Sequence, residues 1–249
     1  MEALNKSDYH GGTRLDYLLN GRYLVRVTPK TRASEPCPWV WRAEFFDAFP
    51  AVDIALLEKG YEIIYYCLSD MYGCPSAVEG MKLAHDTVVR EFNLEQKAVI
   101  LGFSRGGLYA CNYALTYPED ISLIYLDAPV LDTRSWPLCL VGKNIRRKAD
   151  CAREAQQCLE CYGFIDEAAA MAYDKNPVDR LNELVKFPIL LIAGAADTVV
   201  PFDENGQKLF EAMQGHNVKL ILKPGCEHWP HSVEDPTEAV EYIVNNRIK

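Results

Sequence analysis

Residues 98–107 read AVILGFSRGG, and they contain the most informative motif of the chain. The apolar run 98–103 predicts a strand buried on both faces of a sheet, and the residues from Gly106 onward predict a helix. Ser104 lies at the turn between the two, with Gly102 and Gly106 two residues away on either side. An abrupt strand-to-helix turn strains its central residue and exposes that side chain, while the glycines let neighbouring backbone come close. We therefore expect Ser104 to present its Oγ as a nucleophile.

Strands and helices alternate on both sides of this motif. Short apolar runs predict further strands at 61–69, 121–127, 187–193 and 218–222, and amphipathic patterns predict helices at 76–92, 106–117, 203–214 and 236–248. Such alternation favours an α/β fold with a mostly parallel central sheet flanked by helices. Near the start, Asn20-Gly21 between two β-prone runs predicts a hairpin over 17–28. Residues 39–59 keep a helical period that Pro50 interrupts.

One connection is much longer than the others. The 58 residues 129–186 separate the strand ending near Asp127 from the strand starting near Phe187, where a single helix would suffice. This segment mixes helical pattern with cysteines and aromatic residues. We expect one domain over residues 1–249, with 129–186 as an inserted helical cap.

A serine nucleophile needs a base, and the base needs an orienting acid. Asp197 follows the predicted strand at 187–193, and His228 follows the one at 218–222. The order is Ser, Asp, His, with gaps of 93 and 31 residues. Because the carboxyl ends of parallel strands meet at one edge of a sheet, we expect these three side chains to converge there.

The chain resembles the α/β-hydrolases from the hairpin to the C-terminal helix, with only the cap interrupting. The matching motifs are GFSRGG at 102–107, AGAADTVVP at 193–201 and PGCEHWPH at 224–231. The resemblance implies the α/β-hydrolase fold and a catalytic triad. Ser104 would be the nucleophile, His228 the general base and then acid, and Asp197 the residue that holds the imidazole tautomer. It implies no cofactor and no metal.

Two other residues compete for these roles. His231 lies three residues past His228, but the family places its histidine after a G-x-x-H or G-x-G-H turn, which favours His228. Asp127 ends the strand before the cap and is the acid in some relatives, whereas Asp197 stands in the family's G-x-x-D context. At the level of sequence both alternatives stay open.

The resemblance also implies an oxyanion hole. Its first donor would be the backbone N–H of Arg105, which directly follows the nucleophile at the start of a helix. The second donor should come from the loop after the strand ending at Thr28, where the family's usual His-Gly pair is missing. The candidates there are the backbone groups of Trp39, Val40 and Trp41, although both tryptophans equally suit a core. The stretch WVWR also has a looser likeness to bacterial hydrolases of carbohydrate-degrading gene sets.

Substrate selection is expected from the start of the cap. Arg134 and Trp136, together with Arg105, are the candidate substrate-binding residues, because an aromatic platform with charged neighbours suits a sugar or another polar ring. The basic stretch KNIRRK at 143–148 could steer an anionic substrate, but a charge run is more often a solvated helix face.

The chain has nine cysteines, and four of them lie in the cap: Cys139, Cys151, Cys158 and Cys161. Four thiolates can hold a structural zinc ion, but such sites usually have two close ligand pairs. Here only Cys158 and Cys161 are close in sequence. We therefore expect reduced, free thiols and no metal.

The charge balance restricts the partners. The net charge of −9 repels phosphate backbones and anionic lipid headgroups, so neither nucleic acid nor a membrane surface is expected as a partner. No apolar run reaches the roughly 20 residues that cross a bilayer, and residues 1–10 have no apolar region typical of a secretory signal. We expect a cytoplasmic protein. The oligomeric state stays open, and a homo-oligomer formed through the cap is one alternative.

Together these features predict a carboxylic ester hydrolase. Its substrate would be a small soluble ester, cleaved through an acyl-enzyme intermediate. The looser likeness suggests acyl or methyl groups on a carbohydrate. The alternatives are a peptidase or a C–C bond hydrolase with the same triad, or a ligand-binding protein of this fold without turnover.

Overall fold

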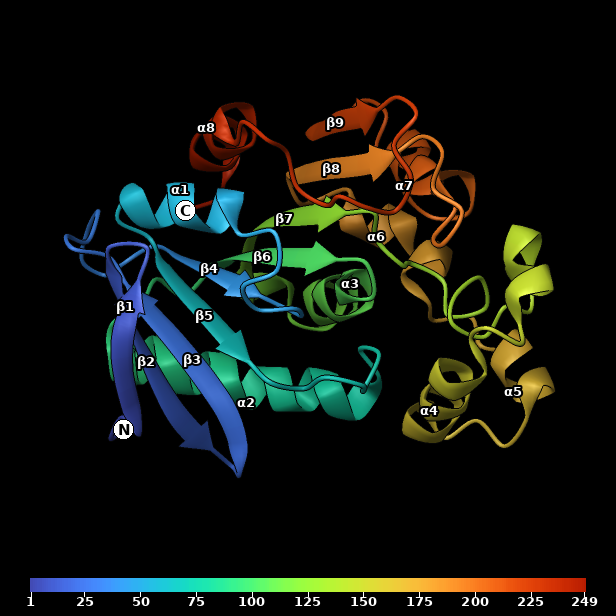
Figure 1. Ribbon diagram of the computed structural model, residues 1–249, viewed down its shortest axis with the longest axis horizontal. Helices are drawn as coiled ribbons and strands as arrows, with labels where there is room; N and C mark the ends of the chain where they lie inside the picture. Colours follow the sequence, from blue (N-terminus) through green and yellow to red (C-terminus); the bar gives the residue numbers. More distant parts are fainter.

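A twisted nine-stranded sheet runs through the protein, with helices on both faces (Figure 1). The computed structural model describes residues 1–249. The strands are β1 (Asn5–Tyr9), β2 (Gly12–Leu19), β3 (Arg22–Thr28), β4 (Trp39–Arg42), β5 (Glu62–Tyr66), β6 (Ala98–Phe103), β7 (Ile121–Asp127), β8 (Ile189–Gly194) and β9 (Val218–Lys223). Their order across the sheet is β1-β2-β3-β5-β4-β6-β7-β8-β9. Pairs among β1, β2, β3 and β5 are antiparallel, and all pairs from β5 to β9 are parallel.

Helices cover the sheet in two layers. These layers contain α1 (Ala51–Glu58), α2 (Pro75–Phe92), α3 (Gly106–Thr116), α7 (Gly206–Ala212) and α8 (Thr237–Asn246), and a 3-10 turn η1 (Pro118–Asp120) precedes β7. One core cluster joins one sheet face to α1 and α8, and a larger cluster joins the other face to α2, α3 and α7. None of the helices is both long enough and apolar enough to cross a bilayer.

The hairpin at the start forms as expected. β2 and β3 pair from Thr13 with Thr28 to Leu19 with Arg22, which leaves two residues for the turn. Those residues are Asn20 and Gly21, with φ of 49° and 74°. Two positive φ angles are what a type I′ turn requires, and Asn-Gly adopts them readily.

The helix expected over 39–59 is wrong in its first half. Residues Trp39–Arg42 form β4, which lies between β5 and β6, and only Ala51–Glu58 is helical. All four residues of β4 are buried, with Trp39 and Trp41 in the larger core cluster and Val40 in the smaller one. A strand that is apolar on both faces has no alternation to distinguish it from a buried helix.

The long connection between β7 and β8 forms several short helices. They are η2 (Gly142–Arg147), α4 (Ala152–Tyr162), α5 (Glu167–Met171), η3 (Pro177–Asp179) and α6 (Leu181–Leu184). In Figure 1, α4 and α5 lie beyond the carboxyl ends of the strands. Hydrogen bonds join α4 to the loop before α2: Tyr72 donates to Gln157 at 2.9 Å, and Tyr162 donates to the carbonyl of Tyr72 at 2.9 Å.

Candidate active site

Ser104 lies in a strained turn between β6 and α3. Its φ is 49°, in the left-handed region that a residue with a side chain rarely adopts. The turn is tight because a Cβ on Gly102 would lie 2.7 Å from the carbonyl oxygen of Gly106. The backbone of Ser104 is also held by the next strand, since its N–H donates to the carbonyl of Asp127 at 2.9 Å and its carbonyl accepts from Val130 at 2.9 Å.

The structure brings Ser104, His228 and Asp197 together in one hydrogen-bonded chain. Ser104 Oγ lies 3.0 Å from His228 Nε2, and His228 Nδ1 lies 2.7 Å from Asp197 Oδ2. The other carboxylate oxygen of Asp197 accepts the backbone N–H groups of Val199 and Val200, each at 2.8 Å. These bonds orient the carboxylate, the carboxylate orients the imidazole, and the imidazole can accept the proton of the serine.

The positions of the three residues follow from the sheet. Ser104 follows β6, Asp197 follows β8 and His228 follows β9, all at the carboxyl ends of parallel strands. His228 is 2% exposed and Asp197 is 8% exposed, so both are shielded from bulk water. The hydrogen bond between them therefore lies in a medium of low dielectric, where it is stronger than at the surface.

The two competing residues pair with each other. His231 Nδ1 lies 2.8 Å from Asp127 Oδ1, and neither residue bonds to the hydrogen-bonded chain at Ser104 through its side chain. Asp127 is 1% exposed, and its other oxygen accepts from the N–H of Ser232 at 2.6 Å and from the hydroxyl of Tyr125 at 3.3 Å. Burial raises the pKa of Tyr125 well above its usual value, so this hydroxyl keeps its proton. The site thus contains two separate His–Asp pairs.

The backbone N–H of Arg105 is free to act as an oxyanion donor, because it donates to no group in the protein. The expectation for Trp39, Val40 and Trp41 is wrong. They lie inside the central strand β4, paired with β5 on one side and β6 on the other, so their backbone groups are used by the sheet. The loop that follows β4 is the one that reaches the turn at Ser104.

That loop offers two backbone N–H groups near the nucleophile. The N–H of Glu44 has no partner in the protein and lies 3.8 Å from where a Cβ on Gly106 would be. The N–H of Phe45 has only a 3.4 Å contact with the neighbouring Glu44 carboxylate, and Phe45 lines the same cavity as Ser104. The sequence pattern does not reveal β4, so it predicts the second oxyanion donor at 39–41. The structure instead offers the N–H groups of Glu44 and Phe45.

The side chain of Arg105 is held within the protein. Its Nη1 lies 2.8 Å from Asp70 and its Nε lies 3.6 Å from Glu44, a residue that is 2% exposed. The guanidinium also lies over the rings of Phe45 and Tyr72, at 5.0 and 5.6 Å from their centroids. Arg105 therefore joins the start of α3 to the loop after β5 through Asp70, with a longer contact to Glu44 in the loop after β4, and it does not line the cavity beside Ser104.

The structure also corrects the other two expected substrate-binding residues. Arg134 is paired with Asp132 at 2.7 Å and with Asp179 at 2.6 Å, so it binds the cap together. Trp136 packs against Tyr72 with ring centroids 6.0 Å apart. Neither residue lines the cavity beside Ser104. Local sequence could not show the pair between Arg134 and Asp179, because it depends on how the cap folds.

A cavity of about 270 Å³ opens beside Ser104 and His228. Most of its wall is aromatic, and the remaining lining residues are Phe45, Ala48, Phe49, Phe103, Trp229 and His231. All of these come from the sheet edge, the loop after β4 and the loop after β9, and none comes from residues 129–186. The expectation that the cap lines the substrate site is therefore wrong for this cavity. The cluster EFFDAF at 44–49 is the feature of the sequence that could have indicated it.

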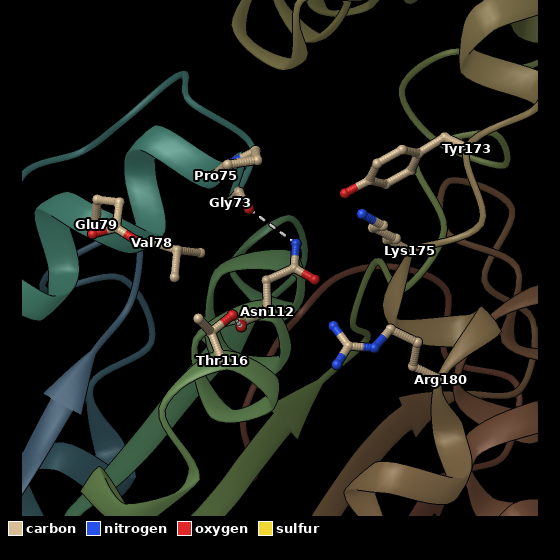
Figure 2. Close-up of a pocket in the computed structure, with 9 residues that line it drawn as sticks. All are labelled: Gly73, Pro75, Val78, Glu79, Asn112, Thr116, Tyr173, Lys175 and Arg180. Atoms are coloured by element: carbon tan, nitrogen blue, oxygen red, sulfur yellow. Dashed lines mark hydrogen bonds between the residues drawn. The ribbon is translucent and has the colours of Figure 1, made fainter.

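The cap instead borders a second hollow of about 170 Å³, on the side of α2 and α3 (Figure 2). Tyr173, Lys175 and Arg180 face it from the cap side, opposite Asn112 of α3. Asn112 donates to the carbonyl of Gly73 at 2.9 Å. This hollow contains no nucleophile with a neighbouring base.

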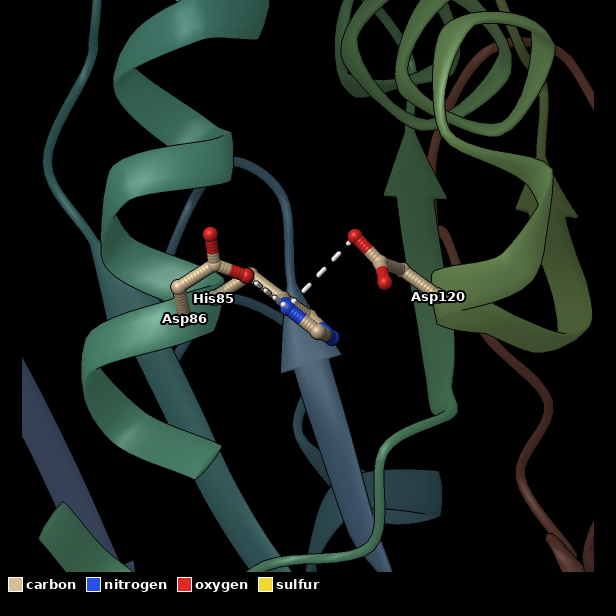
Figure 3. A group of neighbouring side chains, drawn as sticks. All are labelled: His85, Asp86 and Asp120. Carbon is tan, nitrogen blue, oxygen red and sulfur yellow. Dashed lines mark hydrogen bonds and ion pairs between the residues drawn. The ribbon is translucent and has the colours of Figure 1, made fainter. Parts of the chain in front are cut away.

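His85, Asp86 and Asp120 form a group with the residue types of a metal site (Figure 3). The Nζ of Lys82 already lies among them, 2.6 Å from Asp86 and 3.0 Å from Asp120. His85 Nε2 lies 2.8 Å from the carbonyl of Gln96. The ammonium group supplies the positive charge that two carboxylates need, so we interpret this group as a structural ion-pair network.

The cap cysteines do not gather into one site either. All nine cysteines are free thiols. Cys161 Sγ lies 3.2 Å from the carbonyl oxygen of Met71, on the loop that leads into α2. A hydrogen bond from Cys161 is the main cause that lowers the pKa of Cys74 to about 6.

Comparison with known proteins supports the fold at low sequence identity. No family model matches the chain. The acylamino-acid-releasing enzyme of Sus scrofa is 27% identical over an alignment of 169 residues, and the match covers 63% of this chain. This chain matches only 21% of the length of that curated relative.

Solved structures resemble the chain over most of its length. An S-formylglutathione hydrolase from Agrobacterium tumefaciens has a TM-score of 0.64 at 18% identity, covering 92% of this chain and 93% of that one. A puromycin-hydrolyzing peptidase from Mycobacterium tuberculosis has a TM-score of 0.68 at 15% identity, covering 95% of this chain and 40% of that one. At such identities the likeness concerns the fold alone.

Proposed function

We propose that this chain, which has the α/β-hydrolase fold, is a serine hydrolase that cleaves a small ester through an acyl-enzyme intermediate. The observation that carries the proposal is the hydrogen-bonded chain from Ser104 through His228 to Asp197, with distances of 3.0 and 2.7 Å. These distances suit proton transfer from the serine hydroxyl to the imidazole.

In the first half of the reaction, Ser104 Oγ attacks the carbonyl carbon of the ester while His228 Nε2 takes its proton. Asp197 stabilises the imidazolium that forms. The carbonyl oxygen becomes an oxyanion, which the free N–H of Arg105 and an N–H of the loop after β4 would stabilise. His228 then gives the proton to the leaving alcohol, and the acyl group stays on Ser104.

In the second half, water enters where the alcohol left. His228 takes a proton from this water, the resulting hydroxide attacks the acyl-enzyme, and the acid leaves as the proton returns to Ser104. The imidazole of His228 thus accepts one proton and returns it in each half of the reaction. The proposal needs no cofactor for either half.

The cavity supports a small substrate. A volume of about 270 Å³ with mostly aromatic walls accommodates one ring or a short chain. An acyl or methyl ester of a carbohydrate fits this description, because a sugar ring packs against aromatic side chains. Residues 43–49 and 229–231 would then select the substrate.

Peptide hydrolysis is the second candidate function. The 27% identity with the acylamino-acid-releasing enzyme of Sus scrofa favours it, since the same triad chemistry cleaves amides. The nitrogen of an amide is a poorer leaving group than the oxygen of an ester, so an amide is harder to cleave. The two activities are therefore separable with matched substrates.

A fluorophosphonate probe tests whether the serine is reactive. We expect stoichiometric labelling of the folded protein, complete loss of labelling in Ser104→Ala, and unchanged labelling in Ser7→Ala, which removes an exposed hydroxyl on β1. Failure of the folded wild-type protein to react would refute the proposal and support a ligand-binding protein without turnover.

A substrate panel then identifies the bond. Acetylated sugars, sugar methyl esters and N-acylated peptides would be compared at equal concentration, with Ser104→Ala as the blank. We expect turnover of the esters and little release from the peptides. Faster release from the peptides would favour the peptidase instead.

A further inference from the structure

The cavity beside Ser104 contains a second imidazole that the proposed triad does not use. His231 lines this cavity, yet its side chain is only 6% exposed. Its ring is held edge-on by Phe103, Phe49 and His228, with centroid distances of 5.8, 5.4 and 4.8 Å. Three neighbours at steep angles leave the ring little freedom to rotate.

Asp127 sets which nitrogen of His231 has the proton. The carboxylate of Asp127 already accepts from the N–H of Ser232 and from the hydroxyl of Tyr125, so it acts as an acceptor throughout. The 2.8 Å bond to His231 Nδ1 therefore requires a proton on Nδ1. In the neutral ring this leaves a bare lone pair on Nε2.

That lone pair has no partner within the protein. His231 makes one side-chain hydrogen bond, through Nδ1, and Nε2 is not among the buried polar atoms that lack a partner. Nε2 therefore keeps some solvent-accessible surface, and His231 borders two hollows that share Phe49, the cavity with Ser104 and its neighbour. An acceptor in an otherwise aromatic wall is a position where a ligand can be recognised.

We propose that His231 is a specificity-determining residue that accepts a hydrogen bond from a hydroxyl group on a ring of the substrate. The proposal rests on the proposed function of Ser104, because it names the class of ester that the same cavity prefers. The shared chemistry is a six-membered ring with a hydroxyl donor. The ring that has this hydroxyl is either a phenol or a sugar-like saturated ring.

The physical reason is desolvation. Cavities of roughly 150 Å³ already bind benzene, so one of about 270 Å³ accommodates a ring and its linker. When a ring without a donor fills the cavity, Nε2 of His231 loses the hydrogen bond from water and gains none from the ligand. A hydroxyl replaces that water, and we expect this difference to favour the hydroxylated ester by about 5- to 100-fold in kcat/KM.

Matched pairs of esters test the preference. The aromatic pairs are the acetates of para-hydroxyphenylethanol and para-methoxyphenylethanol, and the ethyl esters of the corresponding phenylpropanoic acids. The saturated pair is the acetate of trans-hydroxycyclohexanol against its methyl ether. Methoxyl resembles hydroxyl in electronic effect, but it is larger by one methyl group and cannot donate. We expect hydroxyl to be preferred in at least one pair, and the pair identifies the kind of ring.

The matched variants are His231→Phe and His216→Phe. His216 is an exposed histidine before β9, outside the cavity, so its variant should keep the wild-type ratio. In His231→Phe we expect the ratio to fall to about 1, through loss on the hydroxylated ester. A wild-type ratio near 1 in all pairs, or an unchanged ratio in His231→Phe, would overturn the proposal.

A binding measurement keeps the proposal testable without turnover or a folded His231 variant. Ser104→Ala protein with ¹⁵N-labelled histidine would be titrated with phenol and with anisole. We expect the Nε2 resonance of His231 to shift with phenol only. Equal responses to both probes would refute the role of His231 while leaving the serine hydrolase intact. A phenol-specific shift in a protein that cleaves no ester would refute the proposed function alone.

Discussion

Asp197→Asn separates the two His–Asp pairs most directly. The carboxylate of Asp197 accepts from His228 Nδ1 through one oxygen and from the N–H groups of Val199 and Val200 through the other. An amide can keep the second set of bonds with its oxygen. Its NH₂ group then faces His228 Nδ1, which must give up its proton to accept. The proton moves to Nε2, where it points at Ser104 Oγ, so the imidazole can no longer act as the base.

The size of the effect follows from the charges. During attack on the ester His228 becomes an imidazolium in hydrogen-bond contact with the Asp197 carboxylate, at 2.7 Å between Nδ1 and Oδ2. Two unit charges about 4 Å apart interact by about 4 kcal/mol at an effective dielectric of 20, which corresponds to about a thousandfold in rate. The wrong tautomer adds to this loss. We therefore expect kcat to fall by about 10³- to 10⁴-fold.

Stability should change much less than activity. The bonds to the two valine N–H groups survive, and one charged hydrogen bond is replaced by a neutral one, so we expect the free energy of unfolding to fall by about 1 kcal/mol. The assay is ester hydrolysis by purified protein, with urea unfolding in parallel. An unfolded variant would be recognised at once by the second measurement.

Asp127→Asn is the matched control. It makes the same change in the other His–Asp pair, and it leaves the chain from Ser104 to Asp197 intact. We expect kcat of Asp127→Asn to fall by less than about 100-fold with an ester that has no ring hydroxyl. If Asp127→Asn were the more damaging change, or if Asp197→Asn kept a tenth of the activity, the assignment of the acid would be wrong.

Three further predictions concern stability and are all checked by urea unfolding. Gly107→Ala places a Cβ 2.7 Å from the Cβ of Pro129, so we expect a loss of about 1–3 kcal/mol. Arg42→Met leaves the buried carboxylate of Asp53 without its partner at 3.0 Å, so we expect a loss of about 3–5 kcal/mol that Asp53→Leu partly restores. Burial raises the pKa of Cys111 from 9.0 to about 12, so this thiol destabilises the fold as pH rises above 9. Cys111→Ala should reduce that slope by about 1.4 kcal/mol per pH unit.

The sign of the cysteine effect comes from proton counting. Between pH 9 and about 12 the unfolded chain has lost the proton of Cys111 while the folded chain keeps it, so rising pH favours unfolding. An identical slope with and without Cys111 would contradict the prediction. The Gly107→Ala prediction would be contradicted by an unchanged free energy of unfolding. The Arg42→Met prediction would be contradicted if Asp53→Leu lowered the free energy of unfolding further.

The candidate site could be predicted from sequence where the determinants are local. The turn at Ser104 needs only a strand, a helix and glycines next to each other in the chain. The order Ser104, Asp197, His228 then matches a known arrangement, and each residue follows an apolar run that can be read directly. The hairpin at Asn20-Gly21 was predictable for the same reason, because a type I′ turn depends on two adjacent residues.

The second donor of the oxyanion hole was not predictable, because it depends on β4. Whether WVWR forms a strand or a helix is decided by its neighbours β5 and β6, which enclose it on both sides. Once β4 is the central strand, the loop that contains Glu44 and Phe45 reaches the nucleophile. No periodicity within 39–59 contains that information.

By itself, the sequence determined the alternation of strands and helices, the turn that exposes Ser104, and the three residues that follow the ends of β6, β8 and β9. Apolar periodicity and turn chemistry act over a few residues, so they can be read without the fold. Only the tertiary structure decided that His231 pairs with Asp127, 104 residues away in the chain. It also decided that loops after β4 and β9, rather than the cap, surround the nucleophile, because a cavity is formed by packing between segments that are distant in sequence.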